Sequence, residues 1–164
     1  ELKENPFSNM MEIGLSIGAG LFVYFAWVRL DFPWAKQGES GKGYDPYEAG
    51  VQVGMVLAAI RIVGASVVVP VMEEVFWRSF IIRYIVSPDF TKVKLGTFSL
   101  LSFLITVVFF GVEHHFWFAG MMAGAIYNLL LYKTRRLWPC ILAHGITNLA
   151  MGIHVLTTEE WFWW

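Results

Sequence analysis

Three short polar motifs stand out in a chain that is otherwise rich in apolar residues. They are EEVFWR with Glu73, Glu74 and Arg78, FGVEH with His114, and HGITN with His144 and Asn148. A carboxylate and an imidazole that share one water can deprotonate it, and the hydroxide then attacks a carbonyl. A second imidazole and an amide can donate hydrogen bonds to the oxyanion that forms. These residue types therefore predict hydrolysis of a carbonyl compound by an activated water.

The spacing within the motifs indicates which groups work together. Glu74 and Arg78 are four residues apart on one helix face, so we expect an ion pair between them. Glu73 is rotated by about 100° from Glu74 and lacks that partner, which leaves its carboxylate for chemistry. His144 and Asn148 are also four residues apart and present two polar side chains to one place. Glu73 therefore fits the water-activating role, and His144 with Asn148 fits the oxyanion role.

Each motif also has a purely structural interpretation. His114 fits the water-activating role beside Glu73, but a histidine at a helix end is also common at a membrane interface, which is how we interpret His115. Ion pairs let membrane helices tolerate charge, and polar side chains often join helices within a bundle. The catalytic interpretation depends on finding three polar motifs on three helices in a chain with only 15% charged residues. Three further ionisable residues receive no role: Glu12, Arg61 and His154.

The composition is that of a membrane protein. Of the 164 residues 57% are hydrophobic, and the charged fraction lies below the roughly 25% that is typical of soluble domains. A net charge of −1 offers no basic surface for nucleic acid. The single cysteine, Cys140, excludes an intramolecular disulfide and a cysteine-only metal site. We recognise no signal peptide, and because Glu1 is not an initiator methionine we expect a processed or excerpted piece of a longer chain.

Long apolar blocks predict an all-α, polytopic transmembrane bundle of about five to six helices around an intramembrane polar cavity. We expect helices over 12–30, 50–69, 71–86, 95–112, 118–132 and 139–156. Pro70 should break the apolar pattern, so we expect two helices to meet there. The domain organisation is then one membrane domain over 1–164, an N-terminal span with an extramembrane loop over 1–49, and a core over 67–155 with the three motifs.

Basic residues gather in two loops of this arrangement. They are Arg83, Lys92 and Lys94 in one loop and Lys133, Arg135 and Arg136 in the other, with Glu113, Glu159 and Glu160 at the opposite side. The positive-inside rule places the two basic loops in the cytoplasm of a multi-pass protein of the cell membrane, which we expect to be a bacterial inner membrane. The orientation of the first helix stays open.

Residue depths in this arrangement conflict with a shared site. Counted from the basic loops at 1.5 Å per residue, His144 lies ~10 Å into the membrane, whereas Glu73 and His114 lie ~20–25 Å in. Helix tilt or a late start of the last helix would close this gap.

The order of the motifs resembles a known family. EEVFWR fits EExxxR, FGVEH fits FxxxH and HGITN fits HxxxN, and LWPCILAHGITNL is similar to the usual lead into the third motif. Over about residues 67–155 the chain resembles the CPBP family, the intramembrane proteases related to the type II CAAX prenyl endopeptidase. EHHFWFAG and the aromatic C-terminus resemble the bacterial CAAX-protease-related proteins that are found with exosortase sorting systems.

This resemblance implies roles for the motif residues. Glu73 and His114 would activate the water, His144 and Asn148 would stabilise the oxyanion, and Glu74 and Arg78 would support the site. The implied substrate is a peptide bond of a membrane-associated or lipid-modified protein, in contact with membrane lipid and without nucleic acid. No prenyl-recognition signature is evident, so the resemblance does not imply that substrates are prenylated.

A zinc-dependent version of this reaction is an alternative. Glu73, His114 and His144 would make a His₂Glu ligand set with an open fourth position. The sequence has no HExxH motif, and Asn148 is a poor zinc ligand but a good hydrogen-bond donor. We therefore favour a metal-free mechanism without a cofactor.

Two other functions and the oligomeric state stay open. A non-catalytic scaffold or immunity-type protein could share the fold, because fold alone does not establish activity. Buried acids and histidines also suit a transporter or proton relay, although no inverted repeat is visible. Gly120 and Gly124 form a GxxxG pattern that could pack helices within one chain or between two copies.

Overall fold

The fold is an all-helical membrane bundle. The computed structural model describes residues 6–39 and 41–164, and no β-strand occurs among them. Within these ranges three helical runs are long and apolar enough to cross a membrane: Met10–Arg29, Val51–Val86 and Leu137–Thr158. This confirms the predicted fold class.

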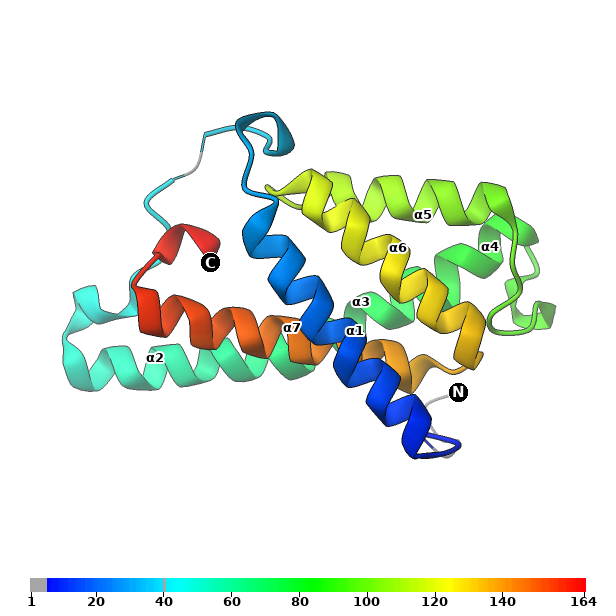
Figure 1. Cartoon of the computed structure of the whole chain (residues 1–164), viewed down its shortest axis with the longest axis horizontal. Coiled ribbons are helices and arrows are strands. Elements are labelled where there is room, and N and C mark those ends of the chain that lie inside the picture. The colour runs from blue at the N-terminus through cyan, green and yellow to red at the C-terminus, as the bar shows by residue number, and fades with distance from the viewer. Residues whose placement is uncertain (1–5, 40) are drawn as a thin grey trace.

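Within the described part of the chain, seven α-helical segments build the bundle, and Figure 1 shows their arrangement. They are α1 (Met10–Arg29), α2 (Val51–Val63), α3 (Val69–Glu74), α4 (Ile82–Val86), α5 (Leu100–Val112), α6 (Trp117–Thr134) and α7 (Leu137–Thr158). Two π-helical segments, Gly64–Val68 and Val75–Ile81, join α2, α3 and α4 into one helical run of 36 residues.

The prediction of two helices meeting at Pro70 is therefore wrong. Proline removes one backbone donor and crowds the carbonyl four residues earlier, here that of Ser66. The π-helical segment Gly64–Val68 contains this carbonyl and lets the helix continue through the proline. The carbonyl of the neighbouring Ala65 accepts a hydrogen bond of 2.8 Å from the Asn148 side chain on α7, so part of the disturbed backbone is satisfied from another helix.

Helix α5 is shorter than predicted. It begins at Leu100 instead of residue 95, and its 13 residues cover ~20 Å, less than the ~30 Å hydrocarbon core. The backbone before it is not helical because Gly96 has a φ of +74° and Ser99 is extended and caps the helix by accepting from the Ser102 amide.

The helices pack closely at glycine residues. Gly20 of α1 lies against the Ala143 carbonyl of α7, and Gly145 of α7 lies against the Ser66 carbonyl of the long helical run. The GxxxG glycines of α6 face α5: a Cβ on Gly120 would lie 3.0 Å from the Gly111 Cα, and one on Gly124 would lie 3.2 Å from the Phe110 ring. This supports the prediction that they pack helices within one chain.

The bundle has a basic end and an opposite end. At the basic end Glu12, near the start of α1, lies 3.8 Å from Arg136 in the loop before α7. Helix α1 therefore begins beside the basic loops, which answers the question of its orientation relative to the other helices. At the opposite end Gln37 donates hydrogen bonds to the carbonyls of Val112 and His114, which joins the loop after α1 to the end of α5.

Candidate active site

Glu74 and Arg78 form a buried ion pair. Arg78 Nε lies 3.1 Å from Glu74 Oε2, and the two side chains are 1% and 0% exposed. The Arg78 guanidinium also lies 4.3 Å from the centre of the Phe110 ring and 5.4 Å from that of Tyr127. Buried charges persist only where they are paired, and the ion pair predicted from the four-residue spacing is confirmed.

The same glutamate holds His144. Glu74 Oε1 lies 2.9 Å from His144 Nδ1, so Glu74 connects Arg78 on its own helix to a histidine on α7. Because a carboxylate paired with arginine accepts hydrogen bonds, Nδ1 carries the proton. The Tyr127 ring stacks on the imidazole with centroids 5.2 Å apart. The ring is thus held so that its Nε2 faces Glu73, 4.0 Å from Glu73 Oε2.

His114 is oriented by its own helix. Its Nδ1 lies 2.6 Å from the Phe110 carbonyl oxygen, one turn earlier in α5. A carbonyl can only accept, so Nδ1 carries the hydrogen and Nε2 keeps its lone pair for the site. The imidazole also packs edge-on against Trp27 of α1, with centroids 5.4 Å apart. His114 therefore has the tautomer that a general base requires.

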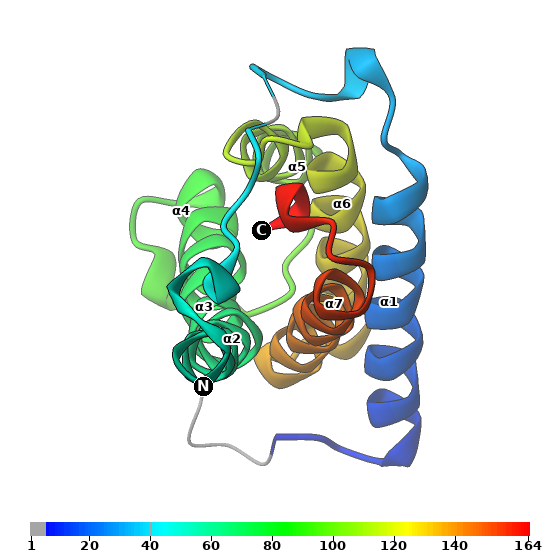
Figure 2. The same ribbon diagram turned by 90° about the vertical axis from the view of Figure 1, so that its left-hand side faces the viewer.

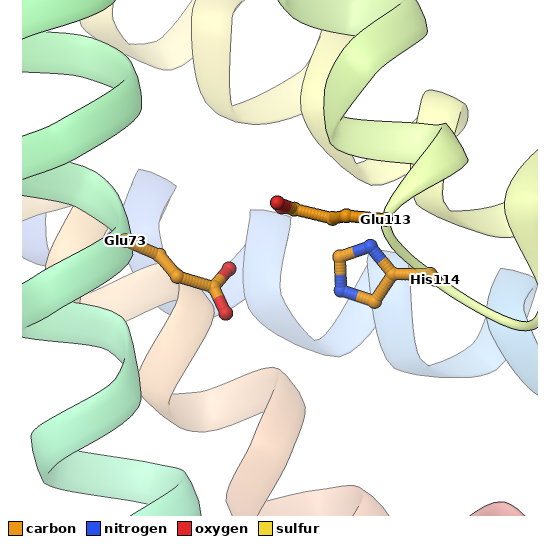
Figure 3. A group of neighbouring side chains, drawn as sticks. All are labelled: Glu73, Glu113 and His114. Atoms are coloured by element: carbon orange, nitrogen blue, oxygen red, sulfur yellow. The ribbon is translucent and has the colours of Figure 1, made fainter.

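Glu73 faces His114 and a second carboxylate that we did not predict. In Figure 3 Glu73 points from α3 toward Glu113 and His114 at the end of α5, and ligand atoms of all three lie within 4.8 Å of one another. Trp77 Nε1 donates a hydrogen bond of 2.9 Å to Glu113 Oε1. Glu73 Oε2 has no hydrogen-bond partner among the described residues. Two carboxylates this close repel each other, and a shared proton or a cation would relieve the repulsion.

From the sequence, Glu113 was assigned only as an acid at the end opposite the basic loops. The available signal was its position directly before His114 in FGVEH, because both residues leave α5 at the same turn. Its partner Trp77 lies 36 residues earlier, so no local spacing indicated the contact.

One cavity brings the four predicted catalytic residues together. It has a volume of about 400 Å³, and Glu73, His114, His144 and Asn148 all line it. Glu74 and Arg78 do not line it and lie buried behind His144. The conflict between residue depths is thus resolved. Estimating the depth of a residue by counting from the basic loops assumes that the helices are parallel and start at one depth. The helices in Figure 1 instead cross obliquely.

Asn148 has a structural contact inside this cavity. Its Nδ2 donates to the Ala65 carbonyl at 2.8 Å, which uses one of the two amide hydrogens. The second hydrogen is available for an oxyanion, one helical turn from His144.

The residues left without a role lie around the site or outside it. Arg61 lines the cavity, with its guanidinium 5.3 Å and 5.1 Å from the ring centres of Tyr44 and Trp164. His154 Nδ1 lies 3.1 Å from the Tyr24 hydroxyl. The His115 carbonyl accepts a backbone hydrogen bond from Gln37. None of these contacts gives His115 or His154 a place in the cavity.

Three side chains of the site could together hold a cation. Among the described residues Glu73, Glu113 and His114 form a group with the donor set of a metal site, two carboxylates and one imidazole. The zinc set expected from the sequence contains His144 in place of Glu113. His144 uses Nδ1 for Glu74, and its Nε2 is the atom left for a metal.

The fold and the cavity define the class: a helical membrane protein with a polar site between its helices. Within that class the model of one family, type II CAAX prenyl endopeptidase Rce1-like, matches residues 55–150. The matched region is more than half of the chain and contains all six motif residues, and the chain belongs to this family. No curated protein and no solved structure matches the chain. The narrower resemblance to the exosortase-associated proteins stays a prediction.

Proposed function

We propose that this chain is an intramembrane endopeptidase that hydrolyses a peptide bond of a membrane-associated or lipid-modified protein. The family is one of prenyl endopeptidases. One observation carries the proposal for this member: Glu73 lies within 4.8 Å of a ligand atom of His114 and 4.0 Å from His144 Nε2, in one cavity. These separations suit a single bridging water and a carbonyl beside it.

The reaction would begin with a water between Glu73 and His114. One of these two bases takes a proton from the water while its oxygen attacks the carbonyl carbon of the scissile amide. The carbonyl oxygen becomes an oxyanion, which a protonated His144 Nε2 and the free Asn148 amide hydrogen would stabilise. The C–N bond then breaks as the transferred proton passes to the leaving nitrogen, which yields a carboxylic acid and an amine.

Glu74 and Arg78 would act through His144. The carboxylate fixes Nδ1 as a donor and orients the ring, so that Nε2 of the protonated imidazole would point toward the oxyanion. Arg78 offsets the charge of Glu74 in a buried place. An indirect role for Glu74 and Arg78 agrees with their positions, since both are buried and do not line the cavity.

The test compares membrane peptides from cells that carry the normal protein, Glu73→Ala, or the control Glu48→Ala. Glu48 is exposed in the loop before α2 and lies outside the cavity. We expect specific cleavage products to disappear with Glu73→Ala and to persist with Glu48→Ala, at equal protein levels. Unchanged products with Glu73→Ala would contradict the proposal and favour a scaffold or a proton relay.

A zinc-dependent version of the reaction is the second candidate, favoured by the Glu73, Glu113 and His114 group. Zinc held there would supply a Lewis acid for the carbonyl. Zinc stoichiometry of active protein, measured before and after a chelator, distinguishes the two. We expect cleavage without bound zinc, and stoichiometric zinc whose removal abolishes cleavage would establish the zinc-dependent version.

A further inference from the structure

Arg61 is a charged residue of the cavity wall that the proposed reaction does not use. It lies on α2, in the long helical run that also carries Glu73, and it lines the same cavity. Within residues 6–39 and 41–164 no carboxylate forms an ion pair with it. Arginine keeps its charge at any physiological pH. The cavity therefore has a fixed cation at this point without an acid of its own beside it.

Two aromatic rings hold the guanidinium of Arg61 in place. The ring centres of Tyr44 and Trp164 lie 5.3 Å and 5.1 Å from it, within the range of cation–π attraction. Tyr44 belongs to the loop that leads into α2, and Trp164 ends the C-terminal turn. Figure 2 shows these two segments side by side. No hydrogen bond from Arg61 occurs among the described residues, so the guanidinium is positioned while its N–H donors stay available.

An apolar wall connects Arg61 to the catalytic carboxylate. Ala65 and Val69 lie between Arg61 and Glu73 at four-residue intervals, and all four residues line the cavity. Twelve residues of helix rise ~18 Å at 1.5 Å per residue, which an extended peptide covers in about five residues. A peptide with its scissile amide beside Glu73 can therefore extend along this wall and bring one of its groups to Arg61.

Helix α7 forms the second side of this path. It packs against the long helical run where Gly145 meets the Ser66 carbonyl and where Gly152 meets the Ile62 side chain. Met151, two turns beyond His144 on α7, lines the cavity. The cavity thus follows the line along which the two elements pack, and it contains both the catalytic groups and the arginine.

We propose that Arg61 determines specificity by binding a carboxylate of the substrate peptide, about five residues from the scissile bond. This statement rests on the proposed endopeptidase function. A guanidinium and a carboxylate form two parallel N–H···O hydrogen bonds, which add geometric selectivity to the attraction of the charges. The carboxylate belongs either to an aspartate or glutamate side chain or to the C-terminus of the peptide, and its chemistry toward Arg61 is the same.

Cut-site sequences test this specificity in cells. We would compare membrane peptides from cells that carry the normal protein, Arg61→Gln, Arg61→Glu, or the control Arg29→Gln. Arg29 is exposed at the end of α1 and does not line the cavity. We expect Glu73-dependent cut sites to have a carboxylate roughly four to six residues away, and we expect these products to be lost with Arg61→Gln and kept with Arg29→Gln. Arg61→Glu should move cleavage to sites with a basic residue at that distance, which a structural role alone would not produce.

Synthetic peptides identify the source of the carboxylate. The probe is a peptide that spans one Glu73-dependent cut site, compared with forms in which the acidic side chain or the C-terminus is converted to an amide. Removing the bound carboxylate should raise KM about ten- to hundredfold at unchanged kcat for the normal protein. It should change KM little for Arg61→Gln, because the pair is already broken. The amide form that shows this effect tells whether a side chain or the C-terminus is bound.

Two results would overturn the inference and leave the endopeptidase intact: Glu73-dependent cut sites without a carboxylate at this distance, or equal effects of amidation on the normal protein and on Arg61→Gln. An absence of Glu73-dependent cut sites would instead contradict the proposed function and the specificity with it. Thermal unfolding of the purified variants checks their fold. Arg61→Lys keeps the charge without the planar fork, and we expect it to retain part of the preference for the acidic peptide even if Arg61→Gln does not fold. A folded Arg61→Lys without any such preference would also overturn the inference.

Discussion

Glu74 touches two partners that lie on different helices, and this decides what its neighbours contribute. Arg78 compensates its charge from one turn away, and His144 donates to its other oxygen. Breaking a buried pair by removing one partner leaves an uncompensated charge, whereas removing both can be nearly neutral. Substitutions of Glu74 and Arg78 can therefore separate two effects: the stability of the protein and the orientation of His144.

We predict that Arg78→Leu lowers the free energy of unfolding by about 3–5 kcal/mol, because Glu74 stays buried without its counter-charge. The double variant Glu74→Leu/Arg78→Leu should recover part of this loss and still lack activity, because His144 has lost its acceptor. Thermal unfolding in detergent and peptide cleavage measure the two effects. Recovery of both stability and activity in the double variant would contradict the orienting role of Glu74.

Glu113 offers a second prediction, through its contact with the Trp77 indole. Glu113→Gln keeps an acceptor oxygen, whereas Glu113→Ala leaves the buried N–H unpaired at a cost of about 1–3 kcal/mol. We therefore expect Glu113→Ala to unfold at lower temperature than Glu113→Gln. Equal melting of the two variants would show that the indole finds another acceptor or that the contact adds no stability.

The sequence allowed the pairing of Glu74 with Arg78 to be predicted, because both groups are on one helix and the spacing alone determines the contact. It did not allow the contact of Glu113 with Trp77 or the approach of Glu113 to Glu73, because these depend on how α5 packs against the long helical run. The partner of His144 was missed for the same reason. Contacts between elements need the tertiary structure.

Helix α7 and the long helical run approach each other at one glycine. A Cβ on Gly145 would lie 2.7 Å from the Ser66 carbonyl oxygen, a distance at which backbone must move. The contact lies one residue from His144, so the spacing between these elements also sets the distance from His144 to Glu73.

We predict that Gly145→Ala separates the two elements and lowers both stability and cleavage. The matched control is Gly64→Ala in the long helical run, where an added Cβ meets nothing within 4 Å. That change should be neutral or stabilising by about 0.5–1 kcal/mol, because alanine costs less backbone entropy in a helix than glycine. The melting temperature and the cleavage rate of the two variants test this prediction. Equal values for both variants would show that the Gly145 contact does not set the spacing between the two elements.

Apolar blocks predicted the existence of the helices well and their limits less well. The error at Pro70 arose because proline usually ends a helix, while here a π-helical segment and a hydrogen bond from Asn148 accommodate it. The late start of α5 was hidden because residues 95–99 are apolar or small and offered no clear break. Backbone geometry, which hydropathy does not report, determines both limits.

At the scale of the whole molecule, the part of the site cavity lined by Trp163 and Trp164 depends on aromatic contacts between segments that are far apart in the chain. Trp163 joins the C-terminal turn to Phe116 after α5, and Tyr47 before α2 lies 6.0 Å from the Trp161 ring. Tryptophan is common at the interface of membrane proteins, so the aromatic C-terminus gave no sign of a place at the site. That Trp163 and Trp164 line the cavity could not be predicted, because it requires the ends of several helices to meet.

We predict that Trp163→Ala widens the cavity. In a Cys140→Ala background, a small methanethiosulfonate reagent should then label Ala65→Cys faster, since both residues line the cavity, while the labelling rate of the exposed Glu48→Cys stays the same. Both rates are obtained by stopping the labelling reaction at several times and measuring the labelled fraction. An unchanged Ala65→Cys rate would mean that access runs past another part of the wall.

The ion pair inside one helix has a consequence for how the protein is made. The helical run that contains Glu74 is synthesised and enters the bilayer before α7 exists, so His144 is not yet there to receive its carboxylate. Arg78 is already present one turn away, and the charge can be balanced during insertion without help from later segments. The arginine thus stabilises its own helix during insertion, and the later arrival of α7 gives Glu74 a second partner, the His144 imidazole.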